Sequence, residues 1–122
     1  MTVPGPPSDD AATRALEALI GQIDRSVEEL HRARERAVTL LADRRAGRRW
    51  LELVTQESRP LVVESISSVL SSLATAGHTW RREEAAALQR EQVSINRIAA
   101  LFGVTRQRIS ALLKGTGPTA GD

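Results

Sequence analysis

The segment Val93–Lys114, VSINRIAALFGVTRQRISALLK, constrains the fold more than any other part of the chain. Ser94 and Thr105 each stand just before a helical pattern and carry a hydroxyl that can cap a helix N-terminus. Gly103 suits a turn between the two helices, because a residue without Cβ adopts a positive φ at little cost. Small Ala99, four residues before this glycine, leaves room where two helices cross. The segment therefore predicts two short helices that meet at a sharp angle.

The apolar and polar residues of this segment separate onto two faces. The residues expected in the core are Ile95, Ile98, Ala99, Phe102, Val104, Ile109, Leu112 and Leu113. The second helix would expose a mainly polar and basic face, made of Arg106, Gln107, Arg108, Ser110, Ala111 and Lys114. A short helix with an apolar inner face and a cationic outer face is suited to the major groove of DNA. The alternative is a helical hairpin that binds protein.

The segment resembles the helix-turn-helix superfamily of bacterial DNA-binding proteins. Its part FGVTRQRIS, Phe102–Ser110, is most similar to the promoter-reading helix-turn-helix at the C-terminal end of sigma factors. The resemblance implies phosphate contacts at Arg97 and Arg108, and base-reading positions at Thr105, Arg106, Gln107, Ser110 and Ala111. Ala111 stands where such families often have a longer polar side chain, so that base reading would rest mainly on Arg106 and Gln107. The upstream sequence shows none of the other promoter-binding regions of a complete sigma factor.

The composition suits a small helical protein and offers little for catalysis. With 122 residues, the chain is long enough for one domain with an appended helix. Trp50, Trp80 and Phe102 are its only aromatic residues, so the core must be aliphatic. The chain has no cysteine, and neither His31 nor His78 has a second ligand at metal spacing. Since no phosphate-binding glycine loop and no Ser/His/Asp arrangement is readable, we expect no enzyme activity, cofactor, metal or small-molecule ligand.

Charge is unevenly distributed along the chain. Residues 1–30 carry two arginines against six acidic residues, whereas residues 31–50 carry seven arginines against two acids. Residues 80–114 carry six arginines and one lysine against three glutamates. Two separate basic zones are typical of a nucleic-acid footprint. The densest basic cluster consists of Arg44, Arg45, Arg48 and Arg49. Three interpretations of it stay open: a second contact to the DNA backbone, a surface for an acidic partner, or an ordinary solvated helix end.

A long amphipathic helix is predicted from about Ala11 to Arg45, with apolar residues in steps of three and four. In a heptad register, the a positions are Ile20, Val27, Arg34 and Leu41, and the d positions are Leu16, Ile23, Leu30 and Ala37. β-Branched residues at a with leucine at d favour a parallel two-stranded coiled coil, so the apolar a and d residues predict a homodimer. The alternative is a helix that packs on the C-terminal helices of its own chain. The residues that widen the apolar stripe and so support this alternative are Leu19, Val38 and Leu40.

Two further helices are predicted between Gly47 and Gly77, the glycines that interrupt the helical pattern. The first would cover about Arg48–Glu57, and the second about Pro60–Thr75. The second shows apolar residues at a spacing of three and four, with serines on its other side: the apolar residues are Val62, Ile66, Val69, Leu70 and Leu73, and the serines are Ser65, Ser67, Ser68, Ser71 and Ser72. Small serines favour either a close approach of helices or a solvated face. A last helix, Trp80–Glu91, would then support the segment that follows.

The sequence thus predicts an all-α protein: a long N-terminal amphipathic helix, linking helices and a C-terminal tri-helical helix-turn-helix. We expect disordered ends at residues 1–10 and 115–122, a dimerisation helix at 11–46, linking helices at 47–77 and a DNA-binding domain at 78–114. The expected function is that of a sequence-specific DNA-binding transcriptional regulator that acts as a homodimer. The alternatives are an adaptor that binds a sigma factor or RNA polymerase, and a nucleoid-associated protein that coats DNA.

The N-terminal residues show no signal region, and no apolar run approaches membrane-spanning length. We therefore expect a cytoplasmic, nucleoid-associated protein without a membrane partner. Its expected partners are double-stranded DNA and a second copy of itself.

Overall fold

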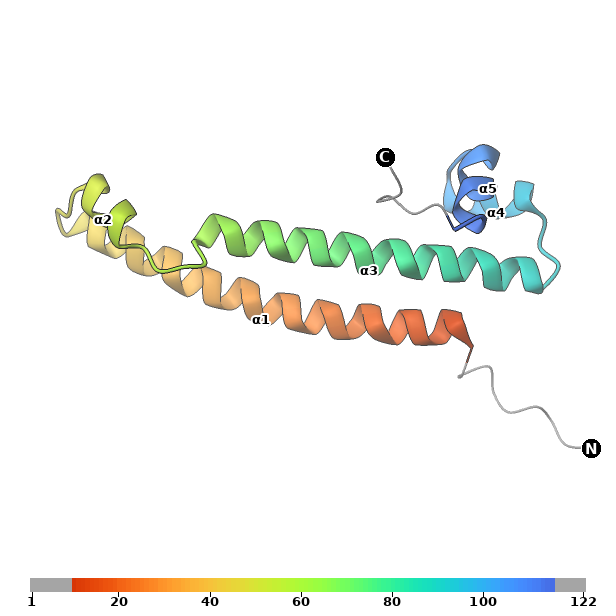
Figure 1. Cartoon of the computed structure of the whole chain (residues 1–122), viewed down its shortest axis with the longest axis horizontal. Helices are drawn as coiled ribbons and strands as arrows, with labels where there is room; N and C mark the ends of the chain where they lie inside the picture. The colour runs from red at the N-terminus through yellow and green to blue at the C-terminus, as the bar shows by residue number, and fades with distance from the viewer. Residues whose placement is uncertain (1–9, 116–122) are drawn as a thin grey trace, which may run out of the picture. The chain divides into compact units, whose positions relative to one another are not determined.

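The structure is a computed structural model that describes residues 10–115, and all regular elements in this range are helices (Figure 1). They are α1 (Ala11–Arg45), α2 (Trp50–Gln56), α3 (Val62–Arg90), α4 (Ile95–Phe102) and α5 (Arg106–Leu113). The expected all-α class is confirmed for this part of the chain. Residues 1–9 and 116–122, for which the sequence predicts disorder, lie outside the described residues.

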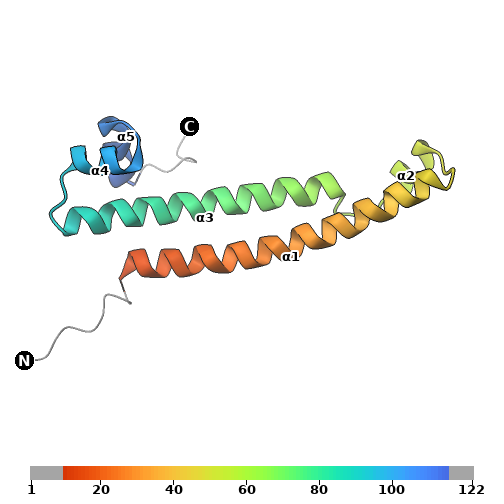
Figure 2. The same cartoon turned by 180° about the vertical axis from the view of Figure 1, so that it is seen from behind.

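The chain divides into two compact units, and both α1 and α3 contribute to each of them. We name Gly21–Ala74 the hairpin unit. The terminal unit combines Met1–Ile20 with Thr75–Asp122, of which residues 10–20 and 75–115 are described. Within each unit, the segments of α1 and α3 lie side by side and run in opposite directions (Figures 1 and 2). Each unit therefore joins segments that are far apart in the sequence.

Helix α1 begins and ends at residues whose chemistry explains its bounds. The Asp10 carboxylate accepts a hydrogen bond from the Thr13 backbone N–H at 2.7 Å, which satisfies a free N-terminal donor. The same hydrogen bonding lowers the pKa of Asp10. Arg44 and Arg45 lie in the last turn, where cations complement the helix dipole. Gly47 follows with a φ of +99°, so the chain turns where the sequence predicts an interruption.

In the hairpin unit, α1 and α3 meet through a seam of small side chains. Ser26 and Ala33 of α1, and Ser65 and Val69 of α3, are only 2–4% exposed. The Arg36 guanidinium donates a hydrogen bond to the Ser65 hydroxyl across the seam at 2.8 Å. A close approach of helices therefore explains part of the serine pattern. The solvated face accounts for the exposed serines, which are Ser67, Ser68 and Ser71.

The large aliphatic residues of α1 take no part in this seam. The heptad residues that are 38–60% exposed in the single chain are Leu16, Ile20, Ile23, Val27, Leu30 and Leu41, and Ala37 is exposed too. Helix α1 does pack on its own chain, but through a different face. The alternative of a helix that packs on its own chain is therefore met in part. Helix α1 packs on α3, but serine and alanine make the contact, because they allow a shorter distance between helix axes than bulky residues do. On α3, Ile66 and Leu70 of the predicted apolar face are exposed as well.

Helix α3 is continuous where the sequence predicts two helices separated at Gly77. The glycine lies inside the helix, and its φ is not positive. A glycine in a helix interior costs about 1 kcal/mol relative to alanine. The neighbouring Ala74 and Ala76 are strong helix formers that offset this cost, so the helix continues.

Two carboxylates fix the start of α3. The helix begins at Val62, two residues after the predicted start at Pro60. The Val62 N–H donates to the Glu57 carboxylate at 2.9 Å, and the Leu61 N–H donates to the Glu64 carboxylate at 2.8 Å. The bond from Leu61 also lowers the pKa of Glu64. These bonds satisfy N-terminal donors of the helix and so place its first turn.

The arginine cluster around α2 is partly used within the hairpin unit. Arg48 forms ion pairs with Asp43 at 3.3 Å and with Glu52 at 2.9 Å. The Arg44 guanidinium lies 5.2 Å from the centroid of the Trp50 ring, at cation–π distance. These contacts connect α2 to the end of α1, so at least two of the four arginines have structural partners.

Candidate functional site

The segment that follows α3 forms two short helices joined by a tight turn. The Ser94 hydroxyl accepts a hydrogen bond from the Arg97 N–H, and the Thr105 hydroxyl accepts one from the Arg108 N–H, both at 3.1 Å. Gly103 ends α4 with a φ of +69°, in the left-handed region. The two caps and the left-handed glycine are therefore confirmed at the residues that the sequence predicts.

Backbone hydrogen bonds close the turn between α4 and α5. The Gly103 N–H donates to the Ala100 carbonyl at 3.3 Å, and the Val104 N–H donates to the Ala99 carbonyl at 3.0 Å. The expectation that Val104 enters the core is wrong, because its side chain is 36% exposed. Since the backbone already holds this residue, the turn does not need its side chain as an anchor. Val104 instead lines an open hollow beside α5.

The inner faces of α4 and α5 share one core with the last turns of α3. The buried residues are Ala85, Ile98, Ala99, Ile109 and Leu112, and the partly buried residues packed on them are Leu88, Val93, Ile95, Phe102 and Leu113. Burial of one isoleucine side chain contributes about 1.5–3 kcal/mol. Ile98 and Ile109, both at most 1% exposed, thus fix the two helices against each other. The sequence did not indicate Ala85, because three consecutive alanines carry no signal for which one faces a core.

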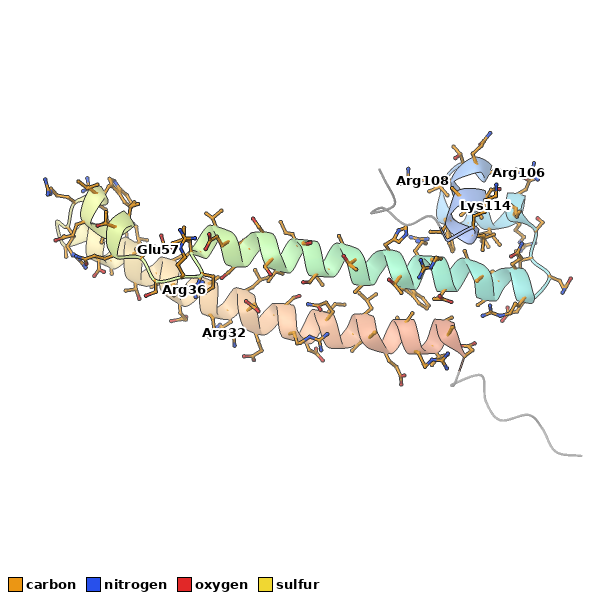
Figure 3. All side chains as sticks on the ribbon, in the orientation of Figure 1. Arg32, Arg36, Glu57, Arg106, Arg108 and Lys114 are labelled. Carbon is orange, nitrogen blue, oxygen red and sulfur yellow. The ribbon has the colours of Figure 1, made fainter. Side chains whose placement is uncertain are left out.

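The opposite face of α5 is polar and basic. Its residues line a shallow hollow and are Arg106, Gln107, Ser110, Ala111 and Lys114. They recur at intervals of about one helical turn and therefore share a face. Figure 3 labels Arg106 at the start of α5 and Lys114 at its C-terminal cap. Small Ser110 and Ala111 lie between longer side chains, so an elongated partner can approach the helix closely there.

The cations of α4 and α5 have no acidic partner. The chain has no Asp or Glu between Val93 and Lys114. Within residues 10–115, ion pairs form at other arginines, and none involves Arg97, Arg106, Arg108 or Lys114. Their charge is therefore not neutralised within the described chain, and the region attracts anions.

The structure places the predicted DNA-contact residues on two helices. Most of these residues belong to α5 or to its two caps: they are Thr105, Arg106, Gln107, Arg108, Ser110, Ala111 and Lys114. Arg97 is exposed in the first turn of α4. All of them lie on the α4–α5 pair, whereas the predicted dimerisation residues lie on α1.

One cation of this region is absent from the residues singled out in the sequence. Arg81 of α3 lies with its guanidinium 4.1 Å from the centroid of the Phe102 ring, at cation–π distance. It shares a hollow with His78 and Arg108, on the side of α5 that faces α3. The contact joins two separate helices, so sequence spacing gave no signal for it.

No family model matches the chain, and the searches of curated proteins and of solved structures find no match either. The residues of the α4–α5 pair are therefore the basis for assigning a function.

The described part of the chain shows neither a membrane-spanning helix nor a group of metal ligands. None of its helices is long and apolar enough to cross a membrane. None of its His, Asp and Glu side chains form a group of three or more that could hold a metal ion.

Proposed function

We propose that the chain is a sequence-specific DNA-binding transcriptional regulator, in which α4 and α5 act as a helix-turn-helix. The end of α3 serves as the first helix of the tri-helical unit. One observation carries the proposal: α5 buries Ile109 and Leu112 on one face and exposes Arg106, Gln107 and Lys114 on the other. A recognition helix needs this division, since one face must hold the helix while the other enters the major groove.

Each exposed residue of the pair has a role that follows from its chemistry. Arg106 and Gln107 reach base edges, where their side chains can form bidentate hydrogen bonds. Thr105 and Ser110 bond phosphate oxygens through their hydroxyls. The cations that neutralise backbone charge are Arg97, Arg108 and Lys114. Small Ala111 leaves room for a base edge or a thymine methyl group.

The regulator acts as a homodimer, because one helix-turn-helix alone makes too few contacts for tight specific binding. The exposed heptad residues of α1 support self-association. A two-fold dimer would prefer paired half-sites, with centres roughly 34–36 Å apart if both units enter the same face of the duplex. Such a protein works in the cytoplasm, in association with the nucleoid.

The test is a selection of preferred duplexes from a random pool, followed by anisotropy titrations at several salt concentrations. We expect the selected site to bind at least roughly 1,000-fold more tightly than a scrambled duplex. A protein that coats DNA would bind both duplexes equally. An adaptor for a sigma factor or RNA polymerase would select no sequence and show no DNA affinity. Either result would contradict the proposal.

A further inference from the structure

Large aliphatic side chains lie on the surface of the hairpin unit, on both of its long helices. Eight of them are 40–71% exposed in the single chain: Ile23, Val27, Leu30, Val38 and Leu41 on α1, and Val63, Ile66 and Leu70 on α3. We name these residues the apolar flank. Scattered aliphatic residues are ordinary on a protein surface, whereas a contiguous apolar patch marks an interaction surface.

Both helices carry the apolar flank on the same side of their pair. Each residue of a helix is rotated by about 100° from the one before it. Ser26 of α1 and Val69 of α3 lie in the buried seam, and Val27 and Leu70 follow them by one residue. Both helices are right-handed, and α1 and α3 run in opposite directions. A step of one residue towards the C-terminus therefore turns away from the seam to the same side of the helix pair in both. The flank is therefore one surface that two helices share.

We propose that the apolar flank packs against the apolar flank of a second copy of this chain. The dimer interface then contains four helices, α1 and α3 from each copy. This inference deepens the proposed homodimer and rests on that part of the proposed function, not on DNA binding. It departs from the two-stranded coiled coil that the sequence predicts, because α3 supplies part of the interface.

The exposed area of the flank is sufficient for a stable dimer. A half-exposed aliphatic side chain presents about 50 Å² of apolar surface, so the flank presents about 400 Å². Since interfaces are about 60% apolar, each copy would bury about 650 Å² in total. The sum for both copies, about 1,300 Å², falls within the range of specific protein interfaces.

The chemistry of the flank favours a copy of itself over a charged partner. None of its residues is charged, so it offers no pattern that would select an acidic or a basic segment. A two-fold axis brings the same patch to both sides of an interface, and an aliphatic patch is complementary to itself. Arg34 falls within the heptad stripe, but its side chain is 71% exposed and pairs with Glu35 at 3.4 Å. Arg34 lies one heptad after Val27 and one before Leu41, so its methylene groups can cover apolar surface while its charged end reaches water beside Glu35.

Sedimentation velocity of the full chain at micromolar concentration tests the contribution of α3. Leu70→Asp places a charge on the flank, and we expect the dissociation constant of the dimer to rise roughly 100-fold or more. The matched control is Ser71→Asp, which adds the same charge at the next, exposed residue, on a side of α3 that faces away from the flank. This control should dimerise like the wild type.

Circular dichroism shows whether both variants still fold. Equal helix content is expected, because Leu70 is already 63% exposed in the single chain. Should Leu70→Asp lose helix content, Leu70→Gln takes its place, with a rise of roughly 10-fold in the same dissociation constant.

A wild-type chain that stays monomeric would overturn the inference. The inference is also overturned if Leu70→Asp has the same dissociation constant for the dimer as Ser71→Asp, whatever substitutions on α1 do. A monomeric double variant Val27→Asp, Leu30→Asp would then identify a two-stranded coil of α1 alone. DNA affinity is measured separately, on a duplex with a single half-site. A wild-type chain that is monomeric but binds the half-site would show that this inference fails while DNA binding stands. A wild-type chain that forms a stable dimer without DNA affinity would show that the proposed function fails while the dimer stands.

Discussion

The α4–α5 pair and the hairpin unit use aliphatic residues in opposite ways. In the pair, Ile98 and Ile109 lie in a closed core and the polar residues lie outside. In the hairpin unit, Ser26 and Ala33 form the contact between helices, and large residues such as Val27 are exposed. Apolar spacing of three and four residues is present in both regions. The difference shows that such spacing predicts an apolar face but not what covers it.

The largest expected effect compares a buried with an exposed aliphatic residue. Ile98→Ala should lower the free energy of unfolding by about 2–5 kcal/mol, because it leaves a cavity in a closed core. Leu70→Ala in the hairpin unit should change the stability of the monomer by less than about 1 kcal/mol. Urea unfolding of both variants, at protein concentrations too low for the dimer to form, measures these changes in the free energy of unfolding. Similar losses at the two positions would mean that the two regions do not differ in packing.

The turn of the α4–α5 pair depends on backbone conformation, not on space. A Cβ at Gly103 would meet nothing within 4 Å, but the φ of +69° is strained for a β-branched residue. Gly103→Val should therefore lower stability by about 2 kcal/mol and abolish DNA binding. Gly103→Asn is the control, since asparagine tolerates this region, and should keep most of the affinity. Thermal unfolding and a DNA titration test both, and wild-type binding by the valine variant would refute the role of the turn.

Removal of one cation should change DNA binding when the cation lies on the outer face of α5, but not when it lies on α1. Arg106→Ala should weaken binding to the best site by about 1–3 kcal/mol and relax preference at one base pair. Arg32→Ala removes the same charge from α1, where Arg32 pairs with Glu28 at 3.7 Å, and should leave sequence preference unchanged. Anisotropy with the selected and the scrambled duplex compares them. An equal loss of affinity for both duplexes would make Arg106 a phosphate contact only.

The smallest expected effect concerns a glycine inside a helix. Gly77→Ala should raise the free energy of unfolding by about 1 kcal/mol, because alanine is the better helix former. Apart from the adjoining backbone of the helix, no atom lies within 4 Å of the added Cβ. Gly47→Ala is the contrasting variant and should be destabilising, since Gly47 has a φ of +99°. Thermal unfolding compares the melting temperature of each variant with that of the wild type. A lower melting temperature for Gly77→Ala would show that this position needs glycine.

Local features of the candidate site were predictable because short-range sterics and hydrogen bonds decide them. Ser94 and Thr105 bond backbone donors three residues ahead, and Gly103 takes a conformation that few residues share. Features that depend on the balance of two small free-energy terms could not be predicted in this way. The helix continues through Gly77 because a small local penalty is outweighed by its neighbours, and Val104 stays outside because the backbone already closes the turn.

By itself, the sequence determined that the described residues are mainly helical, where α4 begins and ends, where α5 begins, and which side of α5 is cationic. These properties follow from residues within one or two turns of each other, so no distant contact is needed to set them. Only the tertiary structure decided that α1 meets α3 through serine and alanine and leaves its heptad stripe exposed. The reason is that an amphipathic helix with two faces suited to packing can be covered on either one. Which face is covered depends on the shape of the partner helix, which lies elsewhere in the sequence.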